Sequence, residues 1–295
     1  MVSMKPVHRR DIGEIVILAI IIVIVIVAAV FIINLVVNEH NSKKPEHDEA
    51  DVLEKERFAL PVSRKERFEK DVNKKVACVM VCCNMSEEDY EFIKNNMDYC
   101  DFFVIDSCNH RQQYSKKISE LLPPGRFRTR RNDGWDTTAW KEFIFENYDE
   151  LKKYSYVILA NNSCRYDFSI EDIISGIHAD NADFYGLMCS NEITTHYQSY
   201  FIVVSSELFA SKDFKDYWER MPKIYTRKDA IDNHELKFYE NFHSKGWPCN
   251  TYYKEFVQPY YLSDYEHRSE VPKFIKKTAV ENPVDKMRYE NLIRV

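Results

Sequence analysis

The sequence predicts an α/β fold in which a mostly parallel sheet carries helices on both faces. From about residue 75 onwards, short apolar segments alternate with amphipathic ones, and strands that alternate with helices along a chain form parallel sheets. The apolar segments are continuous rather than alternating with polar residues, which is typical of strands buried on both faces. The 295 residues, 45% of them hydrophobic, suffice for one core of ordinary domain size.

Local signals place the individual elements. The first helix begins near Ser86, a capping residue that the acidic Glu87 and Glu88 follow. A second helix is stopped by Pro123, Pro124 and Gly125, because proline cannot continue a helix. The expected strands span residues 76–82, 102–105, 127–129, 156–160, 184–188 and 200–204, and further helices are expected at 118–122, 138–148 and 171–178.

The N-terminal region predicts a membrane anchor. Residues 15–37 are apolar apart from Asn34, and about 20 such residues span a bilayer core as a helix. A cleaved signal peptide is the alternative, but its apolar stretch is usually shorter. Basic residues within 1–14 favour a cytosolic tail, and the charged residues 38–72 are typical of a stem. The sequence therefore predicts a single-pass, type II membrane protein with one N-terminal transmembrane helix and its main domain in the Golgi or ER lumen if the cell is eukaryotic.

Composition narrows the expected partners and metal sites. The formal net charge is -6 and no Lys/Arg block stands out, which argues against nucleic acid because phosphate binding leaves a basic footprint. Eight cysteines would suit disulfides in an oxidising compartment. Cys78, Cys82 and Cys83, however, lie in or at the end of an apolar segment, where free cysteine behaves as a small hydrophobe. No Cys-x-x-Cys pair with zinc-finger spacing occurs, so no structural zinc is expected.

Two polar clusters mark the expected binding edge of the sheet. The polar loop at residues 132–136 contains Gly134 and opens a helix, and the apolar strand at 157–160 ends abruptly in Asn161, Asn162 and Ser163. Ligands of α/β sheets bind where strands end and helices begin, and a helix N-terminus favours anionic groups such as a diphosphate. The two clusters predict a nucleotide-type ligand.

The order of motifs resembles the nucleotide-binding half of a GT-A glycosyltransferase, and more specifically the rhamnan synthesis F family of glycosyltransferase-like proteins. The resemblance covers roughly residues 75–255. It rests on five segments in the family's order, namely residues 132–136 (Asn-Asp-Gly-Trp-Asp), 161–163 (Asn-Asn-Ser), 183–186 (Asp-Phe-Tyr-Gly), 198–201 (Gln-Ser-Tyr-Phe) and 214–218 (Phe-Lys-Asp-Tyr-Trp). The resemblance implies a GT-A-like domain over residues 73–262 and a C-terminal extension over 263–295.

The resemblance also implies a set of donor-binding residues. Asn84 and Asp106 end the first two strands, where GT-A enzymes hold the nucleoside, although an aspartate at a strand end also forms turns. Gly134 would let the backbone approach the ligand, and Asp136 would bond a sugar hydroxyl or cap the helix that starts near Thr137. The full set implied for the donor comprises Asn84, Asp106, Asn132, Gly134, Asn161, Asn162 and Ser163.

One residue that differs from the family pattern argues against a bound metal ion. The segment 161–163 corresponds to the metal-binding Asp-x-Asp of GT-A enzymes and to Asn-Asp-Ser in the resembled family, yet Asn162 stands where the aspartate belongs. An amide oxygen is a weaker ligand than a carboxylate for Mn²⁺ or Mg²⁺. Asp167 could substitute only if its loop folds back. Metal dependence, and with it catalysis, is therefore left open.

The expected catalytic residues are Glu235 and Asp136. Glu235 precedes a helix that reaches Gly246, where inverting GT-A enzymes often place the base that deprotonates the acceptor. Asp232 and His234 compete for this role, and an exposed carboxylate in the first turn of a helix is the plain alternative.

On the acceptor side the expected residues are His196 and Gln198. Tyr200 or Trp218 would serve as sugar platforms, with core packing the favoured alternative for Trp218.

The sequence thus predicts a membrane-anchored, hexosyltransferase-type glycosyltransferase that moves a sugar from a nucleotide-sugar donor to a glycan or glycoprotein acceptor. Two alternatives stay open. One is a catalytically inactive relative that still binds sugar nucleotides, which Asn162 favours. The other is a membrane-tethered interaction protein with a vestigial cleft. The expected partners are the donor, the acceptor and the lipid bilayer.

Overall fold

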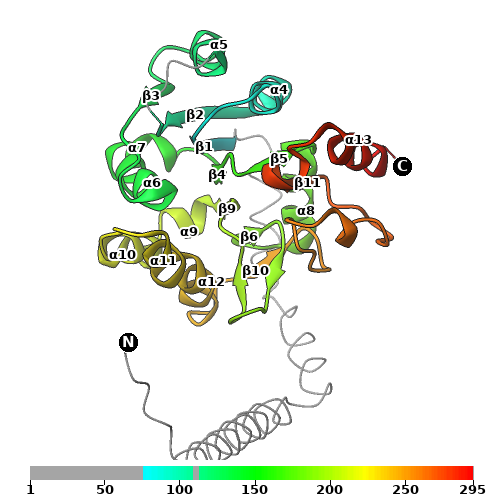
Figure 1. Cartoon of the computed structure of the whole chain (residues 1–295). Coiled ribbons are helices and arrows are strands. Elements are labelled where there is room, and N and C mark those ends of the chain that lie inside the picture. The colour runs from blue at the N-terminus through cyan, green and yellow to red at the C-terminus, as the bar shows by residue number, and fades with distance from the viewer. Residues whose placement is uncertain (1–75, 109–112, 295) are drawn as a thin grey trace, which may run out of the picture. The chain divides into compact units, whose positions relative to one another are not determined.

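A seven-stranded sheet organises the chain, in the spatial order β10-β6-β9-β4-β1-β2-β3 (Figure 1). Its strands are β1 (Val76–Cys82), β2 (Cys100–Asp106), β3 (Phe127–Thr129), β4 (Tyr156–Asn161), β6 (Phe184–Gly186), β9 (Phe201–Ser205) and β10 (Cys249–Thr251). Strand β9 runs antiparallel to both of its neighbours, and the other pairings in this sheet are parallel. The prediction of a mostly parallel sheet is confirmed.

The computed structural model describes residues 76–108 and 113–294. The described residues belong to one compact unit. The expected tail, transmembrane anchor and stem, residues 1–72, lie outside the described residues. Within the described part of the chain, no helix is both long and apolar enough to cross a bilayer.

Helices follow the strands much as their capping signals predict. Helix α4 begins one residue after Ser86, whose backbone N–H donates to Asp89 Oδ2 at 2.9 Å and so satisfies one of the free donors at this helix terminus. The helices are α4 (Glu87–Asn96), α5 (Gln113–Leu121), α6 (Trp135–Glu146), α7 (Tyr148–Leu151), α8 (Ile170–Asp180), α9 (Ser206–Phe209), α10 (Lys212–Arg220), α11 (Arg227–Ala230), α12 (Leu236–His243) and α13 (Pro283–Leu292).

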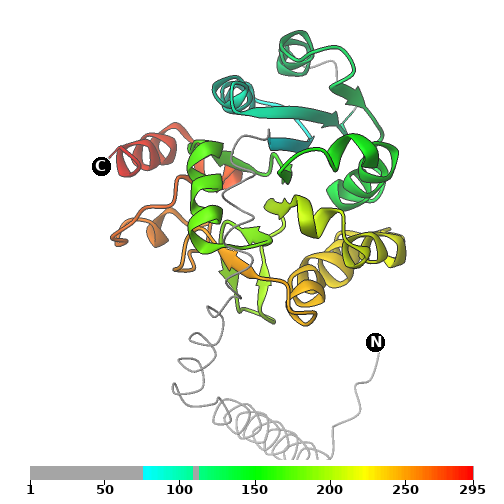
Figure 2. The ribbon, with the colours of Figure 1, turned by 180° about the vertical axis from the view of Figure 1, so that it is seen from behind.

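Two hydrophobic cores sandwich the sheet, because both faces of its central strands are buried. In β1 every residue is buried, and alternate residues join opposite cores. Cys78, Met80 and Cys82 face the core with α4 and α8, while Val79 faces the core with α6, α10 and α12. Figures 1 and 2 show the two groups of helices on either side of the sheet. Trp218 is fully buried in the second core, so the favoured core-packing interpretation of this residue is confirmed.

The C-terminal segment is packed against the same unit. Strand β11 (Phe274–Lys276) pairs antiparallel with β5 (Cys164–Tyr166), directly after the carboxyl end of β4. Helix α13 is held by the fully buried Tyr289 and by an ion pair of 2.9 Å between Arg165 and Glu290. This pairing carries residues from position 274 onwards to the edge of the main sheet where β4 ends.

Candidate functional site

A pocket of about 200 Å³ lies at the carboxyl end of β4. It gathers several predicted site residues from segments far apart in the sequence: Asp136, Asn161, Ser163, Gln198 and Glu235. Carboxyl ends of strands and a helix N-terminus meet here, as the fold class leads us to expect. A larger hollow of about 660 Å³ lies between α4, residues 165–169 and α13, but none of the predicted catalytic, donor or acceptor residues lines it.

The start of α6 places Asp136 in the pocket through an unusual backbone. Gly134 (φ 76°) and Trp135 (φ 56°) both adopt the left-handed conformation. A Cβ atom at Gly134 would approach Thr138 Oγ1 to 2.2 Å, so only glycine fits. A bulky residue at positive φ costs roughly 1–2 kcal/mol, and Trp135 lines the pocket. The interpretation of Asp136 as the helix cap is wrong, because the helix begins at Trp135 and Gly134 occupies the cap.

Asp136 is the first member of a chain of polar contacts. Asn161 Nδ2 donates to Asp136 Oδ2, and Asn161 Oδ1 accepts from Ser163 Oγ at 2.6 Å. Ser163 Oγ in turn accepts from Lys276 Nζ at 2.8 Å. Burial raises the pKa of Asp136 above its usual value, the negative charge of Glu235 adds to the rise, and the bond from Asn161 opposes it. The charge of Glu235 therefore acts on Asp136 across the pocket.

Glu235 lies on the pocket wall at the end of a π-helical turn, Ile231–Glu235, that leads into α12. Single π-turns recur at functional sites. Glu235 Oε2 accepts a bond of 2.5 Å from Ser199 Oγ and one of 3.3 Å from the Ser199 backbone N–H. Its position before a helix agrees with the sequence, and its carboxylate is oriented by Ser199.

The competitors of Glu235 have other surroundings. Asp232 is ion-paired with Lys228 and does not line the pocket. His234 is fully buried, its Nδ1 lies 2.7 Å from Tyr217 Oη, and burial lowers its pKa to about 3. Of the three candidates, Glu235 alone reaches the pocket.

The two expected acceptor residues differ in position. Gln198 lines the pocket. His196 is 3% exposed, its Nδ1 lies 2.7 Å from the carbonyl oxygen of Thr194, and the pocket does not include it. Its Nε2 lies 3.5 Å from Gln198 Nε2, which connects His196 to the pocket.

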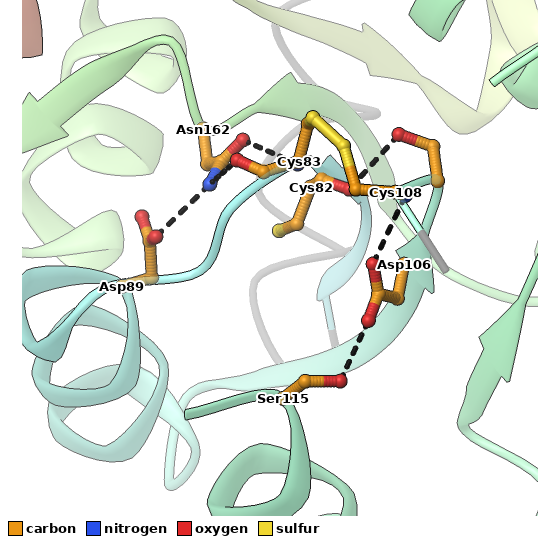
Figure 3. The surroundings of a disulfide bond; sticks show 8 residues. Cys82, Cys83, Asp89, Asp106, Cys108, Ser115 and Asn162 are labelled. Atoms are coloured by element: carbon orange, nitrogen blue, oxygen red, sulfur yellow. Dashed lines mark hydrogen bonds between the residues drawn. A yellow bond between two sulfur atoms is a disulfide. The ribbon is translucent and has the colours of Figure 1, made fainter. Parts of the chain in front are cut away.

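Asn162 belongs to the support of the site rather than to the pocket (Figure 3). The residue is 7% exposed. Its Oδ1 accepts from the Cys83 backbone N–H at 2.8 Å, and its Nδ2 donates to the Cys83 carbonyl and to Asp89 Oδ2, both at 3.0 Å. Two consecutive residues at the end of β4 thus have different positions. The side chain of Asn161 lines the pocket, and that of Asn162 is hydrogen-bonded to the residue that follows β1.

The other predicted nucleoside-side residues also lie outside the pocket. Asp106 is 3% exposed and accepts from Ser115 Oγ at 2.6 Å and from the Cys108 backbone N–H at 3.1 Å, as Figure 3 shows. Asn84, at φ 54°, and Asn132 are exposed, and neither lines the pocket. The contacts of Asp106 agree with the turn-forming alternative, and its role in donor binding stays a prediction.

A disulfide joins Cys83 and Cys108, with a Cα–Cα distance of 5.0 Å (Figure 3). The interpretation of Cys83 as a free, hydrophobic cysteine is wrong, whereas Cys78 and Cys82 are free and buried as expected. The parallel register offers a signal that could have revealed the bond. Cys82 pairs with Asp106, so the residues that follow the two strands emerge side by side.

The described residues do not form a ready-made cage of protein ligands for a divalent metal. Among residues 76–108 and 113–294, no group of three or more His, Cys, Asp or Glu side chains could hold an ion. The amide oxygen of Asn162 is bound by Cys83. Asp167, the alternative ligand, is paired with Arg165 at 2.8 Å.

Sequence reasoning missed two cationic residues of the pocket, Lys276 and Arg227. Lys276 Nζ lies 4.7 Å from the ring centroid of Tyr200 and 5.6 Å from that of Tyr260, which also lines the pocket. Lys276 arrives through the β11–β5 pairing, and no local motif predicts that pairing.

Comparisons with known proteins give a family match and a distant relative. The family model described as rhamnan synthesis protein F matches residues 102–280. The uncharacterised protein y4gN of Sinorhizobium fredii (strain NBRC 101917 / NGR234) is 22% identical over 129 residues, which are 42% of this chain and 34% of that protein. The chain thus spans about a third of this curated relative's length.

Two solved structures show a distant likeness. The apo form of the glycosyltransferase GlyE of Streptococcus pneumoniae TIGR4 has a TM-score of 0.42 and 8% identity, over 74% of this chain and 60% of that one. The apo structure of the bifunctional glycosyltransferase WbbM has a TM-score of 0.34 and 8% identity, over 80% of this chain and 53% of that one.

Proposed function

The chain belongs to the rhamnan synthesis protein F family of glycosyltransferase-like proteins, whose model covers more than half of it, and from this premise we propose that it transfers a sugar from a nucleotide-sugar donor to a glycan or glycoconjugate hydroxyl. The observation that carries the proposal is the convergence of Asp136 and Glu235 on one pocket at the carboxyl end of β4. A GT-A-like arrangement and hexosyl transfer are parts of the same proposal.

The proposed chemistry is a direct displacement at the anomeric carbon. Glu235, oriented by Ser199, takes the proton of the acceptor hydroxyl as its oxygen forms a bond to that carbon. The bond from the anomeric carbon to the diphosphate oxygen breaks, and its electron pair leaves with the nucleoside diphosphate. Asp136 and Asn161 would bind hydroxyls of the donor sugar, with Ser163 on the donor side and Gln198 on the acceptor side. Gly134 does not line the pocket and would act through the backbone that starts α6.

The test is a transfer assay on the full-length chain with a panel of nucleotide-sugars and glycan acceptors. We expect turnover with at least one donor, and a fall in kcat of about a hundredfold or more in Glu235→Gln, because removing a general base typically costs this much. Asp232→Asn is the matched control, since Asp232 lies in the same helical turn but outside the pocket. Equal losses in both variants, or none in Glu235→Gln, would refute the assignment of the base.

A second candidate function is sugar-nucleotide binding without catalysis. The specific observation in its favour is Asn162, which replaces the family's aspartate and holds Cys83 instead of facing the pocket. Saturable binding of a nucleotide-sugar without turnover on any acceptor would select this candidate over the transferase.

We further propose a membrane-anchored protein with residues 15–37 as the anchor and a lumenal domain. The Cys83–Cys108 disulfide supports an oxidising compartment, where such bonds persist. Protease protection in sealed microsomes tests the proposal, because a lumenal domain resists added protease until the membrane is dissolved. Digestion in intact microsomes would place the domain on the cytosolic side.

A further inference from the structure

We infer that Lys276 and Arg227 provide the positive charge that holds the donor's diphosphate, in the role that a divalent metal would otherwise fill. The inference rests on the proposed function and assigns two residues to it. Both side chains line the pocket that also contains Asp136 and Glu235, and they come from segments about fifty residues apart in the sequence. Neither residue belongs to the five segments that carry the family resemblance.

Lys276 is placed at the pocket without being neutralised. Its Nζ donates to Ser163 Oγ at 2.8 Å and lies over the rings of Tyr200 and Tyr260. Among the residues that the structure describes, no carboxylate oxygen lies within 4.0 Å of Lys276 Nζ, so Lys276 forms no ion pair there. A half-buried ammonium with a hydroxyl and two aromatic faces retains donors for an anionic ligand.

Lys277, the next residue along the chain, has a structural role instead. Lys277 Nζ bonds both carboxylate oxygens of the buried Asp89, at 2.7 and 2.6 Å, and a third bond reaches Ser86. Lys277 therefore fastens the end of β11 to the start of α4. Lys276, one position earlier, faces the pocket instead.

Arg227 supplies a second cation from the start of α11. The residue is exposed, lines the pocket and forms no ion pair with any carboxylate in the described ranges 76–108 and 113–294. The acids nearest to it along the chain are engaged elsewhere, since Asp229 closes the capping box with Thr226 and Asp232 pairs with Lys228. A guanidinium can bind two phosphate oxygens at once, so Arg227 can hold a diphosphate through paired bonds.

The charges of the pocket require such cations if a diphosphate binds there. Asp136 and Glu235 bring two carboxylates, and an added diphosphate would be repelled without compensation. The segment 161–163 offers no carboxylate for a metal, and the amide of Asn162 is held by Cys83 and Asp89. Within the pocket, Lys276 and Arg227 are the residues whose charge opposes that of the ligand.

The experiment is calorimetric titration of the full-length chain with UDP, GDP, dTDP and inorganic pyrophosphate, in excess EDTA and separately with Mn²⁺. We expect a nucleoside diphosphate to bind in EDTA, with a Kd that rises about 10- to 100-fold in Lys276→Ala and in Arg227→Ala, as the loss of a charge-assisted bond predicts. Lys276→Arg should retain most of the affinity. Lys273→Ala is the matched control, because Lys273 is an exposed lysine that precedes the same strand and does not line the pocket.

Each outcome bears on the inference. Thermal unfolding checks that every variant folds, and weaker binding in a folded variant at low but not at high salt supports a charge contact. Binding that disappears in EDTA and returns with Mn²⁺ would overturn the inference and leave the proposed function standing. Wild-type affinity in both alanine variants would also overturn it. A wild-type chain that neither binds nor turns over any nucleotide-sugar, with or without Mn²⁺, would overturn the proposed function itself.

Discussion

Replacing Asn162 with aspartate would restore the carboxylate of the family's Asn-Asp-Ser segment, and we expect this change to destabilise the protein rather than create a metal site. The reason lies in the direction of the hydrogen bonds. Asn162 Nδ2 donates both to the Cys83 carbonyl and to Asp89 Oδ2, each at 3.0 Å. A carboxylate accepts bonds only, so the variant loses both donor contacts and turns an oxygen toward Asp89.

The size of the loss follows from these contacts. Asp89 is 2% exposed, and two unit charges about 4 Å apart repel by about 4 kcal/mol at an effective dielectric constant near 20. Lys277, bonded to both oxygens of Asp89, offsets part of this repulsion. The unpaired Cys83 carbonyl adds about 1 kcal/mol. We therefore expect the free energy of unfolding to fall by about 2–4 kcal/mol, which corresponds to a fall in Tm of roughly 5–15 °C for a domain of this size.

The loss should depend on pH with a definite sign. Two adjacent carboxylates favour sharing one proton, so the folded variant binds more protons in mild acid than its unfolded chain does. Stability falls with rising pH wherever the folded state binds more protons. The deficit of Asn162→Asp relative to the wild type should therefore be largest near neutral pH and shrink as the pH falls toward about 4.

Urea unfolding followed by circular dichroism at several pH values measures the deficit. Asn191→Asp, the same change at an exposed loop position, is the matched control and should stay within about 0.5 kcal/mol of the wild type. Adding Asp89→Asn to Asn162→Asp should recover part of the loss, because an amide then faces a carboxylate again. A variant as stable as the wild type at pH 7, or one that gains stability from Mn²⁺ that the wild type does not show, would refute the reasoning.

Three further expectations concern the pocket and its support. Burial raises the pKa of Asp136, so its ionised form lowers the stability of the folded state above that pKa. Asp136→Asn should therefore unfold at a higher temperature than the wild type at neutral pH, lose this advantage in acid and transfer sugar more slowly. A lower melting temperature than the wild type at neutral pH would contradict this. The disulfide joins cysteines 25 residues apart, and its removal in Cys83→Ser/Cys108→Ser should lower the free energy of unfolding in non-reducing urea by about 3 kcal/mol. The double variant should then be as stable as the reduced wild type. Unchanged stability would show that the bond does not constrain the chain. Gly134→Ala should cost about 1–3 kcal/mol in the same assay, since φ is 76° and the new methyl would collide with Thr138, and an unaltered midpoint would count against the described start of α6.

The sequence was sufficient for the parts of the fold that local patterns determine. Continuous apolar segments predicted the buried parallel strands, and the capping signal at Ser86 predicted the start of α4. The same patterns placed Asp136 and Asn161 at the pocket, because a helix N-terminus and a strand end mark the carboxyl edge of a parallel sheet. Glu235 was implied by the resemblance, because inverting GT-A enzymes often place the base before such a helix.

What the sequence could not supply depends on pairing between distant segments. Lys276 enters the pocket because β11 pairs with β5 across about a hundred residues, and nothing in the local sequence near either strand specifies that partner. The disulfide follows from the register of β1 on β2, which brings the ends of both strands together. The direction of the Asn162 side chain likewise depends on Cys83, which follows β1, and on Asp89 in α4.

The two neighbouring asparagines link the stability of the support to the geometry of the pocket. Asn162 is fixed to both backbone groups of Cys83, and the disulfide ties Cys83 in turn to the end of β2. Because Asn161 is the adjacent residue, this anchoring also fixes the backbone from which Asn161 reaches Asp136. A site residue is held in productive geometry when its supporting contacts are satisfied and rigid. Asn162, at the position where the resembled family has an aspartate, therefore holds the Asn161 amide of the pocket in place. In our proposal, Lys276 and Arg227 on other segments compensate the charge of the diphosphate.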